Sequence, residues 1–192
     1  MLKKWFLHKI KSQNIHVFSP TASFDLTYRP AFQFIIEQIE NDPDGRLNLH
    51  EAVDMEYIQK LINKQKKIQR RNMASKKEDR EKVDKLLFIY DDILGDAQMK
   101  SHQSQLSNFT TLSRHSKITN IFLTQSYASI PNKIRQQTPL VFLLNCDNYS
   151  DLQAVENSLK GQQQEFMQLY QEKIILKKDY SFLIVDKSAK IS

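Results

Sequence analysis

Two adjacent carboxylates follow a short apolar run near the middle of the chain. The run spans residues 86–90, and Asp91 and Asp92 come directly after it. If the run forms a buried strand, Asp91 lies at its carboxyl end and Asp92 just beyond it. This is the Walker B arrangement, in which one acid holds the magnesium shell of a nucleotide and its neighbour orients or deprotonates an attacking water. A strand that simply ends in a polar turn ahead of Gly95 is the alternative explanation.

A second apolar run also ends in polar residues. Residues 118–125 close with Thr124 and Gln125. In a parallel sheet the end of this strand would lie beside Asp91, where Gln125 could sense a γ-phosphate or help to place water. A structural cap at the strand end is the alternative role for Gln125.

Two arginines are candidates for charge stabilisation. Arg114 precedes the second run, and Arg135 follows shortly after Pro131. An arginine near a subunit boundary can stabilise phosphoryl transfer in a neighbouring subunit, whereas a surface or helix-end cation needs no such role. The five histidines show no metal-ligand spacing. The single cysteine, Cys146, has no sequence partner that marks a nucleophile, and we assign it to the core.

The basic charge of the chain is concentrated in residues 59–82. This segment holds ten basic and three acidic residues, whereas the net charge of the whole chain is +6. Its sparse apolar spacing predicts a long helix that leaves the core and runs into solvent near residues 71–82. Clustered cations release counterions when they bind nucleic acid, so the segment could be a phosphate-contacting arm that uses Lys64, Lys66, Lys67, Arg70 and Arg71. A solvated helix or a flexible insertion is the alternative.

The elements that must position these residues follow from hydrophobic patterning. Five apolar runs indicate buried strands, at residues 15–19, 86–91, 118–125, 140–146 and 180–186. Most of them are continuously apolar, which is typical of strands covered on both faces. The spacers suit crossover helices at residues 31–40, 51–77, 98–113 and 151–171, and residues 1–12 have helical apolar spacing. The sequence therefore predicts an α/β fold in one domain, 1–192, with a largely parallel sheet and helices on both faces.

Composition excludes several classes of protein and of site. The chain of 192 residues has only three glycines, so neither a phosphate-binding loop of the form G-x-x-x-x-G-K-S/T nor a dinucleotide fingerprint can be written in it. One cysteine excludes a disulfide framework and a cysteine-built zinc site. The apolar runs are too short to span a bilayer, and the basic first 13 residues lack the uninterrupted core of a secretory signal. We therefore expect an intracellular protein.

Taken in order, several short elements resemble one family of viral motors. They are His16-Val-Phe-Ser-Pro-Thr21, Leu86 to Asp92, Ser113-Arg-His-Ser116, Ile121-Phe-Leu-Thr-Gln125 and Ile130-Pro-Asn-Lys-Ile-Arg135. Together they resemble the poxvirus-type genome-packaging ATPases of the FtsK/HerA superfamily, with relatives in giant viruses, virophages and Maverick/Polinton elements. The resemblance covers roughly residues 1–150, and the spaced Asp-Asp, Arg-His and Thr-Gln pairs are its most specific part.

The resemblance implies a RecA-like P-loop NTPase fold of the ASCE type. It also implies a motor that uses ATP and Mg²⁺ to drive double-stranded DNA into a capsid, as a homo-oligomeric ring at a portal or vertex protein. By the same resemblance, Asp91 is the magnesium-shell acid, Asp92 the catalytic acid and Gln125 the strand-end sensor. Arg114 is then the first candidate for the arginine that acts in trans, and Arg135 the second. The site of action would be a viral factory, the nucleus or the virion.

The chain departs from this family in one respect. The family has a first strand and a Walker A loop ahead of the helix that residues 1–12 would continue, and this sequence contains neither. We therefore expect a fragment whose missing part lies upstream, or a degenerate relic. The chain alone is then expected to be inactive. Loss of an internal strand would also expose apolar faces and unpaired backbone groups, which predicts poor solubility or stability.

Two other functions stay open on the sequence. One is a non-enzymatic nucleic-acid-binding domain that uses the basic segment on an inactive α/β scaffold. The other is an α/β regulatory domain in which the carboxylate pair binds only a metal ion. An in-frame G-x-x-x-x-G-K-S/T sequence upstream would favour the ATPase, and salt-sensitive DNA binding without nucleotide binding would favour the first alternative.

Overall fold

Two compact units make up the fold. The computed structural model describes residues 14–21, 48–81, 83–93, 97–144, 146, 148–159, 163–175 and 182–187. The first unit extends to Thr124, and the second begins at Gln125. The helices expected at residues 1–12 and 31–40 lie outside the described residues. That the whole chain forms a single domain stays a prediction.

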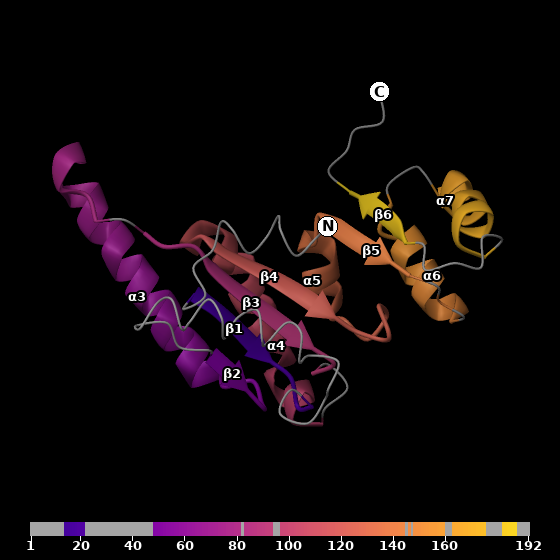
Figure 1. Ribbon diagram of the computed structural model, residues 1–192, viewed down its shortest axis with the longest axis horizontal. Helices are drawn as coiled ribbons and strands as arrows, with labels where there is room; N and C mark the ends of the chain where they lie inside the picture. The colour runs from indigo at the N-terminus through magenta and orange to yellow at the C-terminus, as the bar shows by residue number, and fades with distance from the viewer. Residues whose placement is uncertain are drawn as a thin grey trace, which may run out of the picture. The chain divides into compact units, whose positions relative to one another are not determined.

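A four-stranded parallel sheet forms the centre of the first unit (Figure 1). Its strands are β1 (Ile15–Phe18), β2 (Asn48–His50), β3 (Leu86–Asp91) and β4 (Ile118–Leu123), in the spatial order β2-β1-β3-β4. The register pairs Phe18 with Tyr90 and Asp91 with Leu123. The predicted α/β class and parallel pairing are therefore confirmed for this unit. Sequence patterning missed β2, because Leu49 is its only apolar residue.

Helices α3 (Met55–Ala74) and α4 (Ala97–Ser113) cover the same face of this sheet. Phe88 of β3 shows this, because its ring lies 5.0 Å from that of His16 and 5.7 Å from that of Phe109 in α4. His16 in turn contacts Tyr57 of α3, at 5.7 Å between ring centroids. Both crossovers, β2-α3-β3 and β3-α4-β4, proceed in one direction across the sheet, and right-handed connections then place both helices on one side.

Side chains on the opposite face of the sheet are also buried. Ile15, Val17 and Leu87 form a core cluster there, and Ile89 and Ile121 pack against it. Strands β1 and β3 are therefore covered on both faces, which explains why both are continuously apolar in sequence.

Helix α3 ends earlier than the sequence pattern predicts. It begins at the cap residue Asp54, whose carboxylate accepts a hydrogen bond from the Tyr57 amide at 2.9 Å. It ends at Ala74 rather than continuing toward residue 82, because Ser75 is extended and its hydroxyl donates to the carbonyl of Arg71 at 2.9 Å. The chain then passes through a short 3₁₀ turn, η3 (Lys77–Asp79), and returns alongside the helix. The Asn72 side chain bonds both backbone groups of Glu81, at 2.6 and 2.8 Å.

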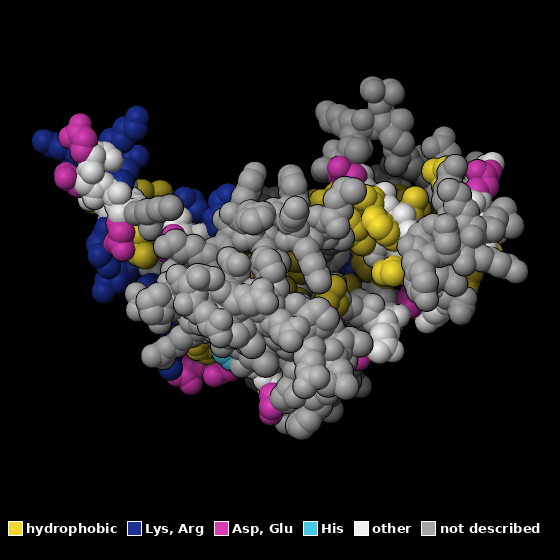
Figure 2. All heavy atoms as spheres, in the orientation of Figure 1, with side chains coloured by type: hydrophobic (Ala, Val, Ile, Leu, Met, Phe, Trp, Pro, Cys, Tyr) yellow, Lys and Arg dark blue, Asp and Glu magenta, His cyan; other side chains and the backbone are white. Residues whose placement is uncertain are grey.

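The second unit contains a separate two-stranded sheet. Its strands β5 (Leu140–Leu143) and β6 (Leu183–Asp186) are antiparallel, and they accompany α5 (Asn132–Gln137), α6 (Tyr149–Glu156), α7 (Gln163–Tyr170) and the π-helical turn η5 (Gln171–Ile175). The expectation that these strands are buried in the parallel sheet is wrong. Burial alternates along β5, with Leu140 and Phe142 both 45% exposed. Hydrophobic side chains gather over β5 and β6 in Figure 2.

Two further expectations need correction in this unit. The helix predicted for residues 151–171 is divided into α6 and α7, and the intervening sequence contains Gly161, which disfavours a continuous helix. Cys146 is half-buried rather than in the core, and its Sγ lies 3.7 Å from the carbonyl oxygen of Asn148. In the described part of the chain, no helix combines the length and apolar character that a membrane span requires.

Candidate functional site

The strand order creates a switch point between β1 and β3. From β1 the chain continues to β2 on one side, whereas β3 lies on the other side of β1. Because the connections diverge there, a crevice for ligands is expected beyond the carboxyl ends of these two strands. Ser19 directly follows β1, and Asp91 is the last residue of β3. The switch point therefore holds a hydroxyl and a carboxylate from segments far apart in the sequence.

Ser19 holds one oxygen of Asp91 in place. Its Oγ donates a hydrogen bond to Asp91 Oδ2 at 2.9 Å and lies 3.4 Å from Thr21 Oγ1. Ser19 is fully buried, and its backbone amide donates to the carbonyl of His50 at 2.9 Å, which ties the β1 end to β2. Asp91 Oδ1 accepts no hydrogen bond from the residues that the structure describes. A half-buried carboxylate is thus oriented with one oxygen left for another ligand.

Asp92 adopts a backbone conformation that most residues avoid. Its φ is 49°, in the left-handed region, and its amide donates to the carbonyl of Leu123 at 3.0 Å. Left-handed geometry costs an L-residue about 1 kcal/mol, although aspartate tolerates it better than most. The turn at Asp92 bends the chain out of the sheet directly at the switch point. Its side chain is exposed there, one residue beyond Asp91.

The end of β4 lies beside the end of β3, as the sequence predicted. The register places Leu123 opposite Asp91. Thr124 is the last residue of the first unit, and the exposed Gln125 begins the second. The adjacency of the two strand ends is therefore confirmed, and the role of Gln125 as a γ-phosphate sensor stays a prediction.

The oxygen donors at the switch point suit Mg²⁺. Magnesium prefers oxygen ligands and is usually held by one or two carboxylates together with phosphate oxygens and waters. Asp91 offers a carboxylate oxygen, and Asp92 follows it. No group of three or more His, Cys, Asp or Glu side chains with metal-binding geometry occurs among the described residues. The donor set therefore fits a magnesium ion that takes its remaining ligands from a nucleotide and water.

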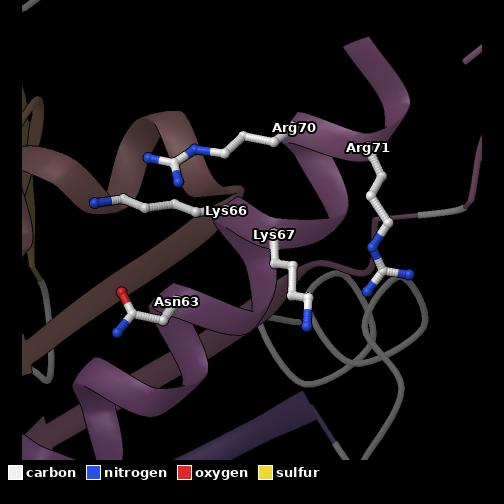
Figure 3. Close-up of a pocket in the computed structure, with 5 residues that line it drawn as sticks. All are labelled: Asn63, Lys66, Lys67, Arg70 and Arg71. Atoms are coloured by element: carbon white, nitrogen blue, oxygen red, sulfur yellow. The ribbon is translucent and has the colours of Figure 1, made fainter. Parts of the chain in front are cut away.

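A second feature of the first unit is the cationic surface of α3, formed by Lys64, Lys66, Lys67, Arg70 and Arg71. Basic side chains gather around this helix in Figure 2. Figure 3 shows that Lys66 and Arg70 extend to one side of α3, whereas Lys67 and Arg71 extend to the other, around a surface hollow that Asn63 also lines. Arg71 pairs with Glu81 at 3.4 Å. Within the described part of the chain, none of the other four cations forms an ion pair.

Comparison with known protein families identifies the chain. It matches the family described as Poxvirus A32 protein over residues 40–190. The chain belongs to the poxvirus A32 family. This is a family of viral genome-packaging ATPases, as the sequence elements had indicated. No curated protein and no solved structure matches the chain.

The A32 match includes all of the site residues that the sequence predicted. It begins before β2 and extends beyond residue 150, where the sequence resemblance had ended, so it covers most of the second unit. Asp91, Asp92, Arg114, Gln125 and Arg135 all lie inside it, whereas Ser19 lies outside. The match alone gives none of these residues a role.

The two predicted arginines are not both placed within this A32-family chain. The side chain of Arg114 lies outside the described residues. Arg135 belongs to α5 in the second unit, and its guanidinium lies over the ring of Tyr127, with 5.7 Å from Cζ to the ring centroid. Arg135 is thus anchored on its own unit.

Ser19 is the site residue that sequence reasoning missed. The element from His16 to Thr21 contributed to the family resemblance, but the sequence alone offered no reason to assign Ser19 a role. A useful signal was available, because a serine directly after the first buried strand of a parallel sheet lies at the edge where ligands bind. Only the pairing of β1 with β3 shows that its partner is Asp91.

An aromatic and imidazole cluster lies between the sheet and α3. Tyr57 Oη lies 3.3 Å from Nδ1 of His16, and the rings of His16 and His50 stack with centroids 6.1 Å apart. Burial, together with a smaller effect of the nearby His50, lowers the pKa of His16 to about 4. Burial also lowers the pKa of His50, against the opposing effect of Asp54. Both imidazoles are therefore neutral near pH 7, and they serve packing rather than charge stabilisation.

Proposed function

We propose that this A32-family chain carries the acidic half of an ATP-hydrolysing site at the carboxyl ends of β1 and β3. The observation that supports it best is the 2.9 Å hydrogen bond from Ser19 to Asp91 at the switch point of the sheet, with Asp92 next in sequence. Ligand sites of open parallel sheets form at such points. The proposal includes the RecA-like P-loop NTPase fold of the FtsK/HerA superfamily.

Each residue in the proposed site has a distinct role. Asp91, oriented by Ser19, would hold the magnesium shell through its second carboxylate oxygen. Asp92 would accept the proton of the attacking water or orient it, and Gln125 would contact the γ-phosphate. Bound magnesium supplies positive charge that stabilises the phosphate oxygens. Arg114 and Arg135 are the candidates for a cation that acts on a neighbouring subunit.

The groups that hold the phosphates are a separate requirement. A G-x-x-x-x-G-K-S/T loop occurs nowhere in these 192 residues. In P-loop enzymes the amides and lysine of that loop bind the phosphates, so the proposed site needs equivalent groups from elsewhere. An upstream Walker A loop in the same reading frame is our prediction for their source, and sequencing the transcript tests it directly.

DNA is the proposed substrate of the motor. Four cations on α3 that lack ion pairs within the described residues support contact with the phosphate backbone of double-stranded DNA. We further propose a homo-oligomeric ring that acts at a capsid portal or vertex protein inside the infected cell. A non-enzymatic nucleic-acid-binding domain is the second candidate function, and the same four cations favour it.

ATP hydrolysis tests the proposed function. It is measured with Mg²⁺ on this chain and on the longest protein that its reading frame encodes. Asp92→Asn should lower turnover at least about a hundredfold, because it removes the proton acceptor without changing side-chain size. Asp79→Asn is the control, because Asp79 is an exposed acid in the turn η3. Hydrolysis by neither protein, together with salt-sensitive DNA binding, would favour the non-enzymatic candidate instead.

A further inference from the structure

Two cations of the second unit lie beside one aromatic ring. Lys187 follows β6 and its Nζ is 5.9 Å from the ring centroid of Tyr127, whereas Arg135 Cζ is 5.7 Å from the same centroid. Tyr127 is buried, and the two cations are half-buried. The three residues come from different parts of the unit: the segment after β4, helix α5 and the end of β6.

Two neutral oxygens of the described residues hold the Lys187 ammonium. It donates to the phenol oxygen of Tyr127 at 3.1 Å and to the backbone carbonyl of Arg135 at 2.7 Å. These bonds fix the ammonium next to Arg135 and leave one N–H for another acceptor. Among the described residues no carboxylate forms an ion pair with Lys187.

The guanidinium of Arg135 is held in position, although it makes no hydrogen bond to the residues that the structure describes. Its Nε is buried and has no hydrogen-bond partner among the described residues, and no ion pair involves it there. A buried donor without a partner is costly, so native structures rarely keep one unless a ligand or water supplies the acceptor. The guanidinium also lies over the ring of Tyr127 in a cation–π contact, which holds it in place.

We propose that Arg135 and Lys187, supported by Tyr127, form a phosphate-binding site in the second unit. Arg135 and Lys187 both contact Tyr127, and among the described residues no carboxylate pairs with either. Two such cations match the charge and the several oxygens of a phosphate group, and arginine binds such oxygens in pairs. All three residues belong to the second unit, and phosphate binding there does not require hydrolysis at Asp91. A nucleotide phosphate and a phosphate of a nucleic-acid backbone present the same oxygen chemistry.

The test follows the Nε–H resonance of Arg135 by ¹H–¹⁵N NMR of the full chain, with the signal assigned by its loss in Arg135→Lys. Inorganic phosphate should shift this signal in a saturable way. Lys187→Gln should weaken phosphate binding at least about tenfold, because it removes a charge-assisted hydrogen bond. Lys133→Gln removes the same charge from the exposed surface of α5 and should change binding less than about twofold.

The Nε–H signal separates binding from a structural role of Lys187. If Lys187 only ties three segments together, its substitution lowers thermal stability but phosphate does not move the signal even in the unsubstituted chain, and the proposal is wrong. Equal weakening by Lys187→Gln and Lys133→Gln would also overturn it, because attraction would then be non-specific. Competition by ATP or by a short DNA duplex then identifies which molecule carries the phosphate, and either outcome supports the site.

Discussion

The contact between Ser19 and Asp91 joins two segments at the point where the proposed chemistry would occur. We expect Ser19→Ala to lower the rate of ATP hydrolysis about tenfold, because Asp91 loses the donor that orients it. The free energy of unfolding should fall by about 1 kcal/mol. The rate of hydrolysis and the free energy of unfolding are both measured on this chain or on the longer protein of its reading frame, whichever hydrolyses ATP.

The matched control for this substitution is Ser113→Ala. Ser113 is also buried, and its hydroxyl donates to the carbonyl of Thr110 and accepts from the Asn120 side chain, both at 2.7 Å. Its loss should cost similar stability without changing turnover. Equal losses of turnover in the two variants would show that Ser19 acts only through stability.

Tyr90 offers a second prediction for a single residue. Its hydroxyl is buried without a hydrogen-bond partner among the described residues, and burial raises its pKa well above the usual value. Tyr90→Phe should therefore leave the free energy of unfolding unchanged or raise it by up to about 1 kcal/mol. Chemical denaturation measures the change.

Tyr170→Phe is the comparison for this effect. Tyr170 is as fully buried as Tyr90, but its hydroxyl accepts the amide of Cys146 at 2.7 Å and lies 3.1 Å from the carbonyl of the same residue. Its removal should cost about 1 to 3 kcal/mol, because the Cys146 amide is then left without a partner. If Tyr90→Phe lowered the free energy of unfolding more than Tyr170→Phe does, the Tyr90 hydroxyl would have a hydrogen-bond partner after all.

At the scale of elements, the attachment of α3 to the sheet should be sensitive to acid. The pKa of His16 is about 4 in the folded chain and about 6.5 when unfolded. The unfolded chain therefore binds more protons between these values, so stability is complete above pH 6.5 and declines as the pH falls toward 4. The loss should reach up to about 3 kcal/mol.

Denaturation at several pH values measures this loss. Replacing His16 by Gln should remove most of the decline between pH 6.5 and 4. The pH dependence of stability that remains should come from His50, whose pKa burial also lowers, and from the carboxylates. If the free energy of unfolding depended on pH in the same way with and without His16, burial of this residue would not explain the sensitivity to acid.

The cationic surface of α3 predicts a salt-dependent affinity for DNA. Substituting Lys64, Lys67 or Arg70 by Gln should each weaken binding uniformly across sequences, and the slope of log K against log salt should decrease by about 1. Lys60→Gln is the control on the same helix, because Lys60 pairs with Glu56 at 2.9 Å. A slope that none of the three substitutions changes would place the DNA contact elsewhere.

At the scale of the whole molecule, exposed apolar side chains favour self-association. Phe142 and Ile184 occupy paired positions of β5 and β6, and they are 45% and 54% exposed. Large exposed apolar patches promote association. Phe142→Lys should reduce light scattering at high concentration without lowering thermal stability.

Val141 gives the control for the opposite side of β5. It is buried, so Val141→Lys should destabilise the second unit strongly, because an unpaired charge would be buried. If Phe142→Lys were equally destabilising, the exposed side of the strand would have a structural partner instead.

Local pattern was sufficient for the acidic end of the site. The uninterrupted apolar run before Asp91 identified β3 with its observed bounds, and the concentration of charge identified the surface of α3. Both features depend on neighbours in sequence, because the burial of a strand and the density of charge can be predicted from consecutive residues.

Contacts between residues far apart in the sequence could not be predicted from such local patterns. Ser19 and Asp91 meet because β1 pairs with β3, and Arg135 meets Lys187 because α5 and the end of β6 fold together. The apolar runs of β5 and β6 resemble buried parallel strands in sequence, yet they pair with each other in a separate sheet. Hydrophobicity specifies which residues avoid water, whereas strand partners and directions follow from the packing and hydrogen bonding of the assembled chain.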